Sequence, residues 1–104
     1  MTSNTPLRSP SPGRPVRGLS PEQVLSIADV LATRLPCTVH NYQALAAIAG
    51  ASTPRMCGIP LIVDARELAR GVADVVLALS PLSAHNEAFA DLIFGVILAL
   101  NEQD

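Results

Sequence analysis

The chain contains no lysine and no tryptophan, and only one Tyr and two Phe stand among its 104 residues. A core must therefore be built mainly from Ala, Val, Leu and Ile. All seven cations are arginine: three lie within residues 1–21, which hold no acid, and four lie within residues 22–104 among nine acidic side chains. This acidic body argues against general nucleic-acid binding, which depends on clustered basic residues.

Cysteines and long apolar runs are also scarce. Cys37 and Cys57 are too few for a disulfide framework, and the N-terminus lacks the apolar segment of a secretory signal. The longest apolar run, residues 92–100, is far shorter than the roughly 20 residues that span a bilayer. We therefore expect a cytoplasmic protein with reduced thiols and no membrane contact.

Residues 1–18 are rich in proline and arginine and show no hydrophobic period. Such composition is typical of disorder, so we predict a disordered tail over 1–18 and a single domain over 19–104.

Four helices are predicted within that domain. Ser20 with Gln23 forms a capping box before a helix that Pro36 ends, and Asn41 begins a shorter helix that ends around residues 50–54. Asp64 caps a third helix that Pro81 stops. The residues expected to face inward on these three helices are Val24, Ile27, Ala28, Leu31 and Leu35; Tyr42, Leu45 and Ile48; and Leu68, Val72, Val75 and Leu79.

The fourth helix, over about residues 83–100, is apolar around most of its circumference. A helix of this kind is buried on nearly every side, so we expect it at the centre of the fold. No alternating strand pattern occurs, and residues 52–62 read as a loop, with a short extended piece at 61–63 as the one possible exception. The sequence therefore predicts an all-α bundle.

The stretch S-P-L-S-A-H-N-E-A at residues 80–88 interrupts two apolar segments and is followed by a helix ending in L-N at 100–101. Together with the helices before it, this order resembles the Fic/Doc family, in its death-on-curing toxin branch, whose motif is H-P-F-x-x-G-N-K/G-R. The resemblance spans roughly residues 19–101. It implies a Fic/Doc-like bundle with a central C-terminal helix, and a motif loop that binds nucleotide phosphates for phosphoryl or adenylyl transfer to a protein hydroxyl.

Three positions of this sequence fit the family motif. Pro81 and Asn86 match its proline and asparagine, and Leu82 replaces its phenylalanine. The resemblance gives the asparagine the task of orienting a phosphate, which makes Asn86 the candidate nucleotide-binding residue.

The positions that carry the chemistry differ. The general base is replaced by Ser80, which takes up no proton near neutral pH, and the glycine of the anion-binding turn is His85. A side chain there is strained wherever φ is positive. Glu87 and Ala88 replace the lysine and arginine, so local charge changes from positive to negative. We therefore predict a site that is degenerate for the family reaction.

Family members continue beyond the L-N end of this helix, whereas this chain stops at Asp104 and looks truncated by comparison. The missing cover would leave Phe94, Ile97 or Leu98 exposed, and an apolar patch of this kind usually marks an interface. We expect self-association or an antitoxin-like protein partner there.

The sequence thus favours a degenerate Fic/Doc-like member of a toxin–antitoxin system that acts through protein–protein contact. One alternative is an active nucleotide-dependent transferase that uses His85 and Asn86 with ATP and magnesium. Another is an unrelated small helical dimerising protein. No other cofactor and no metal site are expected, because Cys37 and His40 have metal-ligand spacing but Cys57 and His85 do not complete it.

Overall fold

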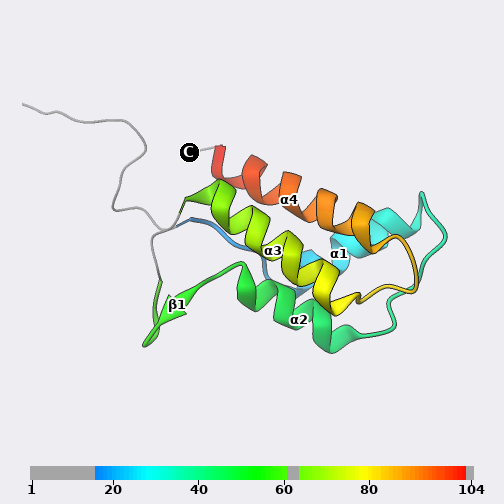
Figure 1. Ribbon diagram of the computed structural model, residues 1–104, viewed down its shortest axis with the longest axis horizontal. Helices are drawn as coiled ribbons and strands as arrows, with labels where there is room; N and C mark the ends of the chain where they lie inside the picture. The colour runs from blue at the N-terminus through cyan, green and yellow to red at the C-terminus, as the bar shows by residue number, and fades with distance from the viewer. Residues whose placement is uncertain (1–15, 61–63, 103–104) are drawn as a thin grey trace, which may run out of the picture.

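The computed structural model describes residues 16–60 and 64–102, and the main chain alone at Met56 and Pro60. Four helices make up the fold: α1 (Pro21–Ala32), α2 (Tyr42–Ala51), α3 (Ala65–Leu79) and α4 (Asn86–Glu102). Successive helices run in opposite directions, and α4 packs against both α3 and α1, which closes the bundle (Figure 1). The predicted all-α class is confirmed.

The predicted capping signals all operate. At α1, the Ser20 hydroxyl accepts from the Gln23 amide at 3.1 Å and the Gln23 side chain accepts from the Ser20 amide at 2.8 Å. The side chain of Asn41 caps α2 by accepting from the Ala44 amide, and the side chain of Asp64 caps α3 by accepting from the Glu67 amide. Each cap satisfies amides that a helix start leaves without a partner.

The core consists of aliphatic side chains from all four helices and one aromatic ring, that of Phe89. On α4, Phe89, Ala90, Ile93 and Ile97 are buried, whereas Asp91, Gly95 and Ala99 are exposed. The expectation that this helix is buried on nearly every side is therefore confirmed except along one stripe: the residues at positions 87, 91, 95 and 99 are exposed, and the other apolar side chains of α4 are buried or packed in part against the core.

The inward faces of α2 and α3 differ from the prediction at their ends. Tyr42 is 65% exposed, because it is the first residue of α2 and lies beyond the bundle interior. On α3 the buried residues are Leu68, Ala69, Val72 and Val76, while Val75 is half-buried and Leu79 is exposed. Ala69 is part of the buried stripe on α3, which therefore lies closer to Ala69 than the spacing of the large apolar residues alone predicts.

The predicted loop after α2 contains a short antiparallel hairpin, β1 (Arg55–Met56) with β2 (Ile59–Pro60). Cys57 and Gly58 form its turn with φ of 54° and 80°. Two positive φ values are typical of the tight turn that joins such strands. The extended piece suggested for residues 61–63 lies outside the described residues.

A strap, which we define as residues 16–19, crosses the end of the bundle where α2 and α4 finish (Figure 1). The Arg17 amide donates to Asn101 Oδ1 at 2.7 Å, and Asn101 Nδ2 donates to the Arg17 carbonyl at 3.1 Å. Leu19 is buried, and its amide donates to the hydroxyl of Ser52 at 2.7 Å. Residues 16–18, assigned to the tail by composition, are therefore packed; residues 1–15 lie outside the described part.

Candidate functional site

The candidate site is the connection between α3 and α4, which begins at Ser80. This residue ends α3 in the left-handed conformation, with φ 45°, and its amide donates to the Val76 carbonyl at 2.9 Å. Its hydroxyl donates to the Leu77 carbonyl at 3.1 Å. Ser80 thus closes a helix, and its hydroxyl is engaged with the main chain of that helix.

The connection then pairs with the segment between α1 and α2. Val39 and Leu82 form an isolated antiparallel bridge. The His40 amide donates to the Pro81 carbonyl at 3.0 Å, the Ser83 amide to the Thr38 carbonyl at 2.8 Å, and the Thr38 amide to Ser83 Oγ at 2.9 Å. These bonds fasten residues 81–83 to the segment between α1 and α2, and the side chains of Pro81 and Leu82 are buried.

Asn86, the predicted nucleotide-binding residue, uses both polar atoms of its side chain on this same connection. Its Oδ1 accepts from the Leu82 amide at 3.0 Å and its Nδ2 donates to the Leu82 carbonyl at 3.0 Å. The amide group therefore closes the turn from Leu82 to the first residue of α4. It is a structural clamp on Leu82.

His85 has φ 65°, a conformation that favours glycine. Its carbonyl accepts from the Phe89 amide at 3.1 Å, so it immediately precedes the first turn of α4. The side chain is exposed. The position that corresponds to the motif glycine thus has the main-chain conformation for which a glycine is suited, but it carries an imidazole.

The first turn of α4 brings no positive charge to this end of the molecule. Glu87 is exposed there, and Ala88 is half-buried and packs against the core. The helix dipole favours an anion near its N-terminus by only about 0.3–1 kcal/mol, and the carboxylate of Glu87 already interacts with that dipole. The turn therefore presents a negative surface to any phosphate.

The structure also brings His40 to the site, although its spacing from Cys37 pointed only to metal binding. Its Nε2 lies 3.2 Å from the Ser80 carbonyl oxygen. The pairing of two loops that are far apart in the sequence brings the His40 side chain to Ser80. No local sequence pattern predicts such a contact. Within the described residues, no group of three or more His, Cys, Asp or Glu side chains is arranged to hold a metal ion; Cys37 and Cys57 are free thiols.

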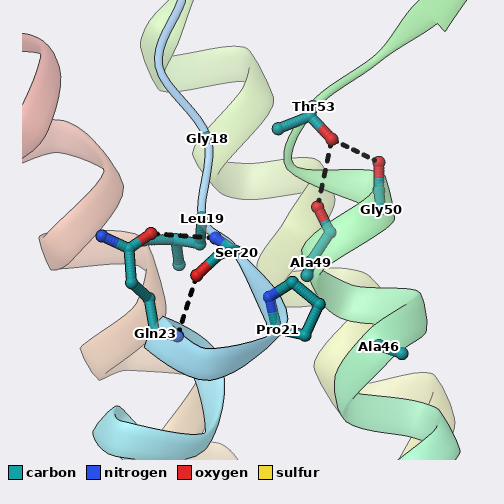
Figure 2. A pocket seen from close by; sticks show the side chains of 9 residues that line it. All are labelled: Gly18, Leu19, Ser20, Pro21, Gln23, Ala46, Ala49, Gly50 and Thr53. Atoms are coloured by element: carbon teal, nitrogen blue, oxygen red, sulfur yellow. Dashed lines mark hydrogen bonds between the residues drawn. The ribbon is translucent and has the colours of Figure 1, made fainter.

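Concave surfaces lined by described residues lie on the bundle in at least two places. A recess of about 260 Å³ lies between α1, the start of α2 and the two paired loops, and Leu82 is the member of the motif loop that lines it. A wider groove of about 510 Å³ lies between the start of α1 and the end of α2 (Figure 2). Gly18, Pro21, Ala46 and Gly50 line this groove, and it contains none of the motif residues.

The predicted interface residues on α4 do not share one environment. Phe94 and Leu98 are half-buried, while Ile97 is fully buried in the core. The expectation of an exposed Ile97 is therefore wrong: its side chain lies on the same inward face as Phe89 and Ile93.

None of the helices in the described part of the chain is long and apolar enough to cross a membrane. No family model, no curated protein sequence and no solved structure matches the chain significantly.

Proposed function

We propose that this chain is a cytoplasmic, Fic/Doc-like protein of a toxin–antitoxin system whose motif loop no longer catalyses group transfer, and which acts through protein–protein contact. The observation that carries the proposal is the internal use of the motif side chains. Asn86 is bonded at both polar atoms to Leu82, and the Ser80 hydroxyl is bonded to Leu77.

The electrostatics support the same view. A transferase of this kind needs a proton acceptor at the attacking hydroxyl and positive charge at the transferred phosphate. Ser80 occupies the position of the proton acceptor. Glu87, an exposed carboxylate, and Ala88 occupy the positions of the two cations. The positions at which the family carries its base and its two cations therefore supply neither a proton acceptor nor positive charge for a nucleotide.

A role in protein–protein contact is supported by the outer flank of α4, where Phe94 and Leu98 stand one turn apart and are only half-buried. When a partner covers apolar side chains that are partly exposed to solvent, their burial stabilises the complex. The proposed partner is an antitoxin-like protein or a second copy of the chain.

The experiment that tests the loss of catalysis is thermal unfolding with and without magnesium-ATP at millimolar concentration. A nucleotide present at 100 times its Kd would add about 2.7 kcal/mol to the free energy of unfolding, so binding is easily seen. We expect no shift for the natural chain. A clear shift would favour the alternative of an active transferase that uses His85 and Asn86.

A variant that combines His85→Gly, Glu87→Lys and Ala88→Arg provides the comparison. These changes restore the glycine and the two cations at positions that follow the motif, where His85 already has a positive φ. Nucleotide binding by this variant, together with none by the natural chain, would support descent of the loop from a phosphate-binding site. Light scattering at several protein concentrations tests self-association. If the chain is monomeric at all of them, self-association is excluded and the proposed partner is a different protein.

A further inference from the structure

The recess of about 260 Å³ beside the motif loop has a composition that suits one kind of ligand group. Three parts of the fold meet there: Asp29 from the last turn of α1, Tyr42 from the start of α2, and Leu82 from the loop before α4. Thr38 and Val39, on the strand-like segment that pairs with the motif loop, complete the lining.

The two side chains with binding chemistry are open to solvent. Asp29 is exposed. Tyr42 is the chain's one tyrosine and keeps 65% of its surface exposed. A carboxylate and an aromatic ring on one recess attract a cation through charge and through the negative face of the ring. Ala32, which is exposed, and Val39, which is half-buried, supply apolar contacts for the stem of such a group.

We infer that this recess binds an arginine side chain presented by a basic segment of a partner protein. The inference rests on the proposed role in protein–protein contact and adds the chemical class of the partner. Arginine fits better than lysine because its planar guanidinium stacks on an aromatic ring while donating to a carboxylate.

Size and charge support this occupant. The volume is below the roughly 300–1,000 Å³ of sites for drug-sized ligands, and it suits one side chain. Residues 22–104 carry four arginines against nine acidic residues, so the bundle as a whole attracts a basic partner. Arginine and tyrosine are also the residue types on which interface binding energy concentrates.

The test uses the ¹⁵N-labelled full chain and two probes, the tripeptide acetyl-Gly-Arg-Gly-amide and its citrulline counterpart, which has nearly the same shape without the charge. Amide chemical shifts are followed during titration at low salt. We expect changes centred on Thr38, Val39 and Tyr42, with citrulline binding about fivefold more weakly. Added salt should weaken arginine binding, because the pair is partly screened.

Three variants complete the design. Asp29→Asn is expected to weaken arginine binding about fivefold and Tyr42→Ala about threefold. Asp91→Asn is the matched control, since Asp91 is an exposed carboxylate on α4 outside the recess, and it should leave the Kd unchanged. Asp29 and Tyr42 are both exposed, so these substitutions are expected to preserve the fold.

The inference is overturned if the shift changes spread over the acidic surface, if citrulline binds as well as arginine, if Asp29→Asn and Asp91→Asn have equal effects, or if the recess does not respond. None of these results bears on nucleotide binding. Failure here is therefore distinguishable from failure of the proposed loss of catalysis, which the magnesium-ATP experiment reports separately.

Discussion

Gly18→Ala is the substitution that most directly tests how the strap is seated. An added Cβ at this position would overlap the Ser52 carbonyl oxygen and the Thr53 side chain, and would lie 2.6 Å from the Ser52 carbonyl carbon. Two of these three atoms belong to the main chain at the end of α2, so they cannot rotate away. The strap must lift instead.

Lifting the strap removes contacts whose free energies can be added approximately. Burial of the Leu19 side chain, 3% exposed, contributes about 1.5–3 kcal/mol. The hydrogen bonds of the Leu19 amide to Ser52 and of Arg17 to Asn101 contribute about 0.5–1.5 kcal/mol each. Since the strap is expected to keep part of these contacts, we predict a loss of about 2–4 kcal/mol. In a domain of this size that loss lowers Tm by roughly 10–20 °C.

The assay is urea unfolding followed by circular dichroism, with Gly50→Ala as the matched control. A Cβ at Gly50 meets no atom within 4 Å, and the position is helical, so this variant should be unchanged or more stable by up to about 1 kcal/mol. A Gly18→Ala variant within 0.5 kcal/mol of the natural chain, on the order of the scatter for surface substitutions, would refute the close packing of Gly18 on Ser52.

Two further predictions concern the motif loop. His85→Gly should raise the free energy of unfolding by about 0.5–1 kcal/mol, because it removes the strain of φ 65° at a residue whose side chain is exposed; chemical denaturation measures this, and a destabilised variant would contradict it. Asn86→Ala should cost about 1–3 kcal/mol, because it leaves the Leu82 amide and carbonyl without their partner. Glu87→Gln, at the neighbouring exposed position, should stay within about 1 kcal/mol of the natural chain and serves as the control.

Three of the four helix starts were predictable because they are encoded locally, whereas the fourth helix was expected from about residue 83 and begins at Asn86. Ser20, Asn41 and Asp64 each bond to an amide three residues later, and a capping residue followed by an apolar period is visible in a single window of sequence. The positions that were mispredicted depend on neighbours in space. Tyr42 fits the helical period of α2 but projects beyond the bundle end, and Ala69 takes a buried place on α3 while Leu79 is exposed.

The candidate site was predictable only in part. The motif spacing indicated that the residue at position 85 would matter for its φ, and the left-handed conformation of His85 agrees with that concern. The approach of His40 to Ser80 depends on how two loops, separated by a helical hairpin, pair with each other. Such pairing has no signature in either segment alone. The Fic/Doc relationship itself stays a prediction from the residues.

The bonds between Arg17 and Asn101 join residues 84 positions apart. Because the polypeptide emerges from the ribosome with its N-terminus first, residue 17 is made early and residue 101 is made after nearly all of the bundle. A nascent chain can place Leu19 beside Ser52 once α2 exists, but it cannot fasten the other end of the strap until α4 is synthesised. The strap is therefore fastened at both of its ends only when the final turn of α4 has formed.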